Sequence, residues 1–282
     1  MHIHRQNTLL YNRALVADAD APKTWDDFFS LAARLIARGI VPLALSATGG
    51  WPLEYLFVAV MAGTRGIEFH DTFYRGEMDM SDPQNVASVA DALDTYIELL
   101  SMTNANAGEL DWDEAADLLM NGEATMYLHG DWTKGYYQSM AWIPGVDFNA
   151  IAAPGNQGSF IYSIDAFALC ANAPNRDNAL DFFRVIGGSQ AQSSIVIFKA
   201  GIPARNDANT TGWDMVTMAA YDDYRNAKIR HNTELHQFNL ERTPVVGGYG
   251  GVPDRLYDHY QGKMTRDEVL GGLTLNYDVA SW

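Results

Sequence analysis

Carboxylates that occur close together are the residues of this sequence best suited to chemistry. Two carboxyl groups that face each other across a cleft can hydrolyse a glycoside, one of them as a general acid. Most of the groups found here lie at expected helix starts or on polar helix faces, where a solvated surface is the better interpretation. They are Asp26/Asp27, Asp91/Asp94, Asp111/Asp113/Glu114 and Asp222/Asp223. A carbohydrate-active enzyme that uses such a pair remains an alternative, but we expect no catalytic residues.

Other motifs of catalysis and metal binding give no stronger signal. The glycine-rich segment 247–251 is not followed by Lys-Ser/Thr, so it does not predict a phosphate-binding loop. His2 and His4 could bind a metal, although at a chain start such residues are more often strand or frayed-end residues. No HExxH or GxSxG motif occurs. We therefore expect neither a metal nor a cofactor.

Asp165 is a single charge within the apolar segment 160–169, which we expect to be a strand. A charge in such a strand is costly unless it is paired or faces a polar cleft. The one cysteine, Cys170, ends this segment, so no disulfide can form within the chain. We expect Cys170 to be a buried strand residue rather than a nucleophile.

The elements that would position these residues alternate between helix and strand. Thr24 is a candidate N-cap, and Asp26 and Asp27 follow it in the first turn, where the helix dipole favours negative charge. Apolar spacing predicts helices over 24–38, 53–61, 83–100, 111–120, 175–186, 190–197, 213–224, 252–260 and 265–270. Strands are expected over 8–11, 41–45, 123–128, 149–153 and 160–169. This order predicts an α/β chain in which helices are layered on sheets.

Composition excludes some classes of function. The 282 residues include 48% hydrophobic residues, enough for a sizeable core, and carry a formal net charge of −16. Such a field repels nucleic acid and anionic membrane surfaces. No apolar stretch reaches the 18 residues expected of a membrane-spanning helix, and no signal peptide is visible at the start.

Several segments, in their shared order and spacing, resemble the family 1 extracellular solute-binding proteins, the group of the maltose- and glucose-binding receptors. They are the opening His4-Arg5-Gln6-Asn7, Pro22-Lys23-Thr24-Trp25-Asp26, Val41-Pro42-Leu43-Ala44-Leu45, Asn121-Gly122-Glu123-Ala124-Thr125-Met126 with Gly130-Asp131-Trp132, the run from Asn172 to Phe183, and Gly201-Ile202-Pro203-Ala204-Arg205. The opening and the last turn are most similar to those of the glucose/mannose receptors. The resemblance implies an α/β fold of the type II periplasmic-binding class, with two lobes joined by hinge strands.

The resemblance also implies a division of the chain. Residues 1–8 would be a hinge strand, 9–153 the second lobe, 154–163 a second hinge crossing, 164–205 a part of the first lobe, and 206–282 the last helices of the second lobe. Roughly 100 residues of the first lobe, about one lobe-sized unit, are expected to be missing at the front. A truncated remnant without binding activity is therefore a further alternative.

The positions that would bind a sugar follow from the same resemblance. Trp132 would stack on the ligand, the alternative being a core tryptophan. Trp51, with Glu54 one helical turn beyond it, is a second candidate or else anchors a loop. Asp165 and Lys199 would bind ligand hydroxyls, or form an ordinary salt bridge. The remaining candidates are His236, with His231 as an equal choice, and the hinge residues His4 and Asn7, whose side chains would reach the cleft.

These residues and the resemblance together predict a carbohydrate receptor. It would capture a monosaccharide or small oligosaccharide and deliver it to the membrane permease subunits of an ABC importer, in the periplasm or outside the cell. It would have no enzymatic activity and no nucleic-acid partner. We expect a monomer unless the missing lobe drives dimerisation.

Overall fold

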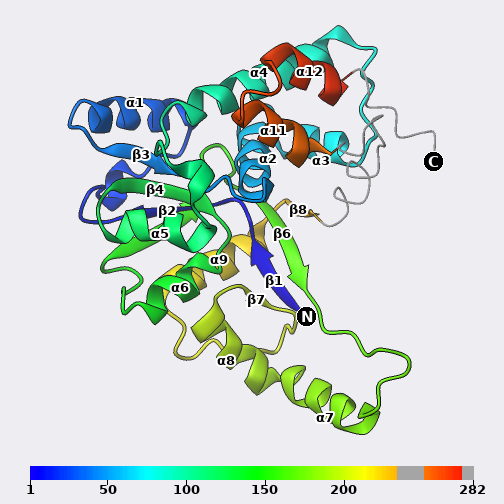
Figure 1. Cartoon of the computed structure of the whole chain (residues 1–282). Coiled ribbons are helices and arrows are strands. Elements are labelled where there is room, and N and C mark those ends of the chain that lie inside the picture. The colour runs from blue at the N-terminus through cyan, green and yellow to red at the C-terminus, as the bar shows by residue number, and fades with distance from the viewer. Residues whose placement is uncertain (234–250, 275–282) are drawn as a thin grey trace.

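The computed structural model describes residues 1–233 and 251–274, and it contains two four-stranded mixed sheets (Figure 1). The first sheet has the order β7-β1-β6-β8 and the second the order β3-β4-β2-β5. The strands are β1 (His2–Arg5), β2 (Thr8–Asn12), β3 (Val41–Ala44), β4 (Ala124–His129), β5 (Phe148–Ala152), β6 (Ser159–Asp165), β7 (Ile202–Pro203) and β8 (Ile229–Asn232). The expected α/β class is confirmed.

Helices cover both sheets. They are α1 (Trp25–Ile36), α2 (Trp51–Arg65), α3 (Ile67–Tyr74), α4 (Pro83–Leu100), α5 (Trp112–Met120), α6 (Thr133–Ser139), α7 (Arg176–Ile186), α8 (Ser189–Lys199), α9 (Met215–Asn226), α11 (Val252–Tyr260) and α12 (Arg266–Thr274), with short 3₁₀ turns at Asp18–Asp20 and Ala107–Glu109. The predicted cap of α1 is confirmed: Thr24 Oγ1 accepts a hydrogen bond from the backbone of Asp27, whose carboxylate accepts one from the backbone of Thr24.

The second sheet has a hydrophobic core on each face, because β2 alternates its side chains. Leu9 and Tyr11 belong to the larger core, which contains buried residues of α1, α2, α4 and α11. Leu10 points to the other face, where α5 packs. The apolar run of β4 is buried along its whole length. Sequence patterning over 8–152 therefore produces a densely packed layer structure.

Two direct strand-to-strand connections join the sheets within the described residues. The first connects β1 to β2 through Gln6 and Asn7, and the second connects β5 to β6. Asn7 is 0% exposed, and its amide bonds the second crossing at Asn156 (3.1 Å) and at the backbone of Ile161 (3.2 Å). The expectation that the Asn7 side chain reaches a cleft is therefore wrong: its hydrogen-bonding groups are used between the crossings.

The segment after β6 differs from the prediction. The strand ends at Asp165, where its neighbour β1 also runs out, since His2 pairs with Asp165. Residues 166–170 are not in a strand, and Cys170 is exposed, so its expected burial is wrong. We call residues 166–199, which include α7 and α8, the arm. In Figure 1 the arm extends to the bottom of the view, far from α1 and α4.

Candidate functional site

Four rings gather where the second sheet meets the first. Trp51 and Tyr55 lie one turn apart on α2, with ring centroids 5.1 Å apart, and Trp132 lies 6.3 Å from Trp51 and 6.0 Å from Tyr55. His129, at the end of β4, is 5.0 Å from Trp51 and 5.1 Å from Trp132. We call these four residues the aromatic cluster. The structure thus brings together the two tryptophans that the sequence predicted.

The turn Gly130-Asp131-Trp132 sets the orientation of the Trp132 ring. The Trp132 ring folds back over Gly130, where an added Cβ would lie 2.1 Å from ring carbons, so only glycine permits this arrangement. The backbone N–H of Asp131 donates to the Arg5 carbonyl (2.9 Å), and its carboxylate accepts from the Arg5 N–H (2.9 Å). The position of Trp132 is therefore set by β1 as well as by β4.

Tyr55 and His129 were not predicted from the sequence. The spacing of Tyr55 four residues after Trp51 places both on one helix face, which is a signal that could have identified it. His129 is stacked on Tyr127 at 4.7 Å and on Trp112 at 5.8 Å, and burial lowers its pKa to about 3. The imidazole is therefore neutral, and it supports the tryptophans as an aromatic ring.

Asp165 and Lys199 form an ion pair beside this cluster. The side chains are 56% and 48% exposed, so both remain accessible to a ligand. Partial burial acts to raise the pKa of Asp165, but the Lys199 hydrogen bond and the charge of His4 outweigh it and hold that pKa below its usual range. Since Gly201 leaves room for the His2 ring and the Ala200 carbonyl bonds His2 Nε2, the turn that carries Lys199 is anchored on β1.

The remaining predicted residues lie elsewhere. Glu54 is buried at 2% exposure. Burial, and to a lesser extent the nearby Glu54 carboxylate, raises the pKa of Tyr55 and of Tyr74. His231 is also buried and is paired with Asp71, with its ring 4.8 Å from that of His70, so it lies against α3. His236 lies outside the described residues.

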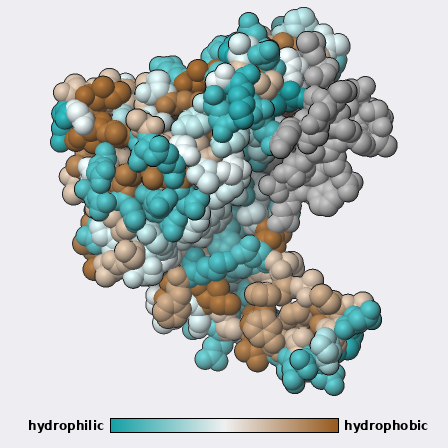
Figure 2. Space-filling model, in the orientation of Figure 1, coloured by the Kyte–Doolittle hydropathy of each residue, from teal (hydrophilic) through white to brown (hydrophobic). Residues whose placement is uncertain are grey.

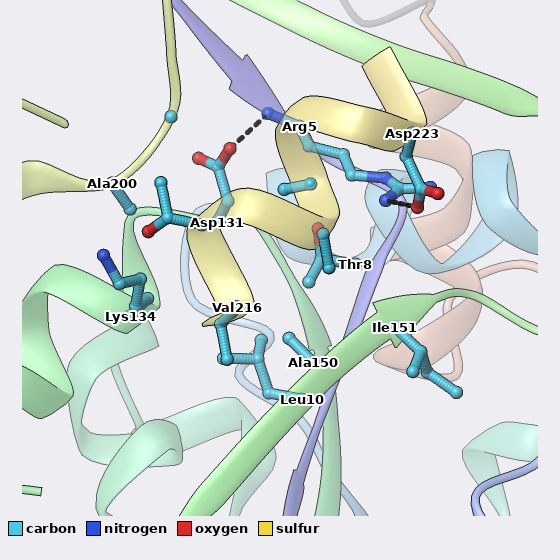
Figure 3. A pocket seen from close by; sticks show the side chains of 14 residues that line it. Arg5, Thr8, Leu10, Asp131, Lys134, Ala150, Ile151, Ala200, Val216 and Asp223 are labelled. Carbon is cyan, nitrogen blue, oxygen red and sulfur yellow. Dashed lines mark hydrogen bonds and ion pairs between the residues drawn. The ribbon is translucent and has the colours of Figure 1, made fainter. Parts of the chain in front are cut away.

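Two hollows flank β1. A cavity of about 30 Å³, too small for a sugar ring, lies between β2 and α9 and is lined by residues that include Arg5, Lys134 and Asp223 (Figure 3). A groove of about 840 Å³ begins at Asp165 and Lys199 and follows the arm. Figure 2 shows apolar side chains gathered over the arm, where this groove runs. Of these two, the larger hollow is the one lined by Asp165 and Lys199.

Several of the grouped carboxylates have structural partners. Asp27 and Asp111 take part in capping boxes, Asp91 pairs with Arg65, and Asp94 pairs with Arg266. Among residues 1–233 and 251–274, no group of His, Cys, Asp and Glu is arranged to hold a metal ion. Within the same residues, no helix combines the length and apolar character needed to cross a membrane.

Comparison with known proteins relates the chain to a family of binding proteins. Residues 2–193 match the family described as bacterial extracellular solute-binding protein. An uncharacterized ABC transporter extracellular-binding protein of Pyrococcus horikoshii is 31% identical over 77% of this chain and 48% of its own length. A probable sugar-binding periplasmic protein of Mesorhizobium japonicum is 29% identical over 80% of this chain and 54% of its own length. The chain thus spans about half the length of these two relatives.

The solved structure of the bacterial solute receptor AcbH, described as having an exclusive preference for b-D-galactopyranose, shares the fold. It superposes with a TM-score of 0.79 at 18% identity, over 99% of this chain and 70% of that one.

Proposed function

Because the chain belongs to the bacterial extracellular solute-binding proteins, we propose that it is the carbohydrate-binding component of an ABC importer. It captures a monosaccharide or small oligosaccharide and performs no chemistry on it. The observation that carries the proposal is the aromatic cluster next to the accessible pair Asp165–Lys199. The names of relatives such as the Mesorhizobium protein support a sugar as the ligand. The family is extracellular, so capture takes place in the periplasm or outside the cell.

The two parts of the site suit different faces of a sugar. Tryptophan rings offer large, rigid apolar surfaces for the C–H face of a pyranose. Asp165 accepts hydrogen bonds from ring hydroxyls and Lys199 donates to them, and bonds to charged groups are roughly twice as strong as neutral ones. In this proposal the ligand inserts between the charges, replacing part of their ion pair, while Trp132 and Trp51 stack on it.

The arrangement of the sheets supports the proposed lobes. In this proposal residues 1–8 and 154–163 act as hinge crossings, 9–153 with the described part of 206–282 form the second lobe, and 164–205 belong to the first. Asn7 bonds the two crossings to each other, as expected of a double-stranded hinge. Two features modify the division: β8 pairs with β6 in the first sheet, and α9 packs on β5 of one sheet and on β6 and β7 of the other. This helix therefore belongs to the hinge region as much as to the second lobe.

Isothermal titration with D-glucose, D-galactose, D-xylose and raffinose tests the proposal. We expect saturable binding of at least one of these sugars, weakened at least tenfold by Trp132→Ala and by Asp165→Asn. Trp142→Ala, a change to a ring that packs on Tyr137 and Phe148 away from the cluster, is the matched control. Absence of heat with every sugar, or equal losses in all three variants, contradicts the proposal.

A further inference from the structure

The His4 imidazole lies between two carboxylates that come from distant parts of the chain. Its Nδ1 is 2.6 Å from Asp131 Oδ1, and its Nε2 is 3.4 Å from Asp165 Oδ2. The side chain is almost fully buried, so its contacts are to protein groups. Asp131 precedes α6, whereas Asp165 ends β6. One ring on β1 therefore joins the turn that carries Trp132 to the strand end that carries Asp165.

The side chains of β1 alternate between its two sides, so the residues that contact the proposed site and the residues that pack against α9 lie on opposite sides of the strand. Ile3 and Arg5 face α9, where Ile3 belongs to a small hydrophobic core and Arg5 pairs with Asp223 at 2.7 Å. His2 and His4 face the opposite side, with their rings 4.8 Å apart. The two histidines thus occupy the side of β1 that faces the proposed site.

Both halves of the proposed site are anchored on this side. His4 bonds Asp131, the residue directly before Trp132, and the His4 and Trp132 ring centroids are 5.6 Å apart. His2 bonds the carbonyl of Ala200, the residue directly after Lys199. Figure 3 shows Asp131 between Arg5 and Ala200, with the bond from the Arg5 backbone drawn. The spacing between the stacking ring and the charged pair is consequently fixed by β1.

We propose that His4 and Asp131 are positioning residues of the sugar site: they hold the Trp132 ring at the distance from Asp165 at which one pyranose contacts both. The inference rests on the proposed function. The bond from His4 Nδ1 to Asp131 is the short contact and is the one that carries the effect. Removing it leaves the Arg5 backbone bonds to hold the turn 130–132, constrains the Asp131 carboxylate less, and widens the range of Trp132 orientations.

Two amide replacements separate the two contacts of His4. His4→Asn places an amide near the position of Nδ1, so it keeps the bond to Asp131. His4→Gln places its amide near Nε2, so it loses that bond while it keeps a polar group facing Asp165. His259→Gln, on α11, is the control, because His259 bonds the carbonyl of Met264 far along the chain from β1.

The readout is the fluorine NMR spectrum of protein that carries 5-fluorotryptophan, with the Trp132 signal assigned by Trp132→Phe. In the ligand-free protein we expect His4→Gln to shift or broaden the Trp132 signal, while His4→Asn and His259→Gln leave it unchanged. Asp131→Ala removes both this bond and the one from the Arg5 N–H, so it should shift or broaden the Trp132 signal at least as much as His4→Gln. Equal spectra for His4→Asn and His4→Gln overturn the inference.

The affinity for sugar gives a second, independent test. For whichever of the four sugars binds, the dissociation constant should rise at least tenfold in His4→Gln and less than threefold in His4→Asn. Equal affinities of the two variants also overturn the inference. Because the fluorine signal is recorded without ligand, it tests the positioning of Trp132 even if no sugar binds, a result that would contradict only the proposed function.

Discussion

The region 8–152 and the arm are both built from amphipathic helices, but their apolar sides meet different surroundings. In α1, the residues Trp25, Phe28 and Leu31 are buried in the larger core. In α7, which is also amphipathic, no residue is buried, and Phe182 and Val185 are exposed. The comparison teaches that helical patterning specifies the element and the side meant for packing. Whether that apolar side is buried, which supplies most of the stability of a helix, depends on which other elements of the fold pack against it.

The largest difference in the loss of unfolding free energy is expected between a buried phenylalanine of α2 and an exposed one of the arm. Phe57 of α2 is fully buried against Tyr96, so Phe57→Ala should lower the free energy of unfolding by about 4 kcal/mol. Phe182→Ala in the arm should change it by less than about 0.5 kcal/mol, because that ring is already half exposed. Urea unfolding measures both. Similar losses would show that the arm is as tightly packed as the core.

Ion pairs should show the same contrast. Lys134 is buried and pairs with Asp214 at 2.7 Å, so Asp214→Asn should cost about 3 kcal/mol at pH 7, the low end for a buried pair. Asparagine retains the capping role of Asp214 at α9. Arg184→Ala, which breaks an exposed pair in the arm, should cost less than about 0.5 kcal/mol.

The pH dependence of the Asp214 pair has a definite sign. Burial acts to raise the pKa of Asp214, but the bond from Lys134 outweighs it, and the net pKa is lowered. A lowered pKa in the folded state stabilises the protein above the unfolded value of 3.8 and loses that effect as the pH falls through the folded value. The difference between the wild type and Asp214→Asn should therefore shrink below about pH 4. A difference that does not shrink at all as the pH falls below about 4 would exclude this ion pair as its cause.

A smaller effect should loosen the arm from the rest of the chain. Gly135 of α6 lies against the end of α8, and a Cβ there would be 2.8 Å from the Phe198 carbonyl oxygen. Strain of about 2 kcal/mol, partly offset by the higher helix propensity of alanine, predicts a net loss of about 1 kcal/mol for Gly135→Ala. Amide exchange should accelerate in 189–199 and not in α2. Ser139→Ala, on the exposed end of α6, serves as the control.

The smallest change in stability is expected on the exposed side of the arm. Phe198 is 76% exposed, so Phe198→Ser should alter the unfolding free energy by less than about 0.5 kcal/mol. It should nevertheless reduce binding of the dye ANS, since Phe198 lines the groove along α8. Unchanged dye fluorescence would show that the apolar side of the arm is covered.

The sequence predicted much of this structure where its signals are local. The bounds of α4 and α11 and the cap of α1 follow from Pro, Thr and Asp at the first turns. Helix α6 was missed because Gly135 interrupts its short pattern. The end of β6 was misplaced because it depends on where β1 begins, at His2, 163 residues earlier in the chain, and no apolar count contains that information.

The sequence predicted most of the residues of the candidate site, but not the contacts between distant segments that bring them together. Trp51 and Trp132, and likewise Asp165 and Lys199, do come together. Asn7 and Glu54 turned out to be buried. The two carboxylates at His4 could not be foreseen, since they are 127 and 161 positions away and meet only through the pairing of β1 with β6 and the Asp131–Arg5 bonds.

The bonds of Asn7 restrict how the two sheets can move. Its side-chain oxygen accepts from Arg5 Nε at 3.1 Å and from the backbone of Ile161, and its amide group donates to Asn156. Crossings that are bonded to each other cannot slide independently. A change in the angle between the sheets therefore has to bend both crossings together, so the two connections act as one bending element.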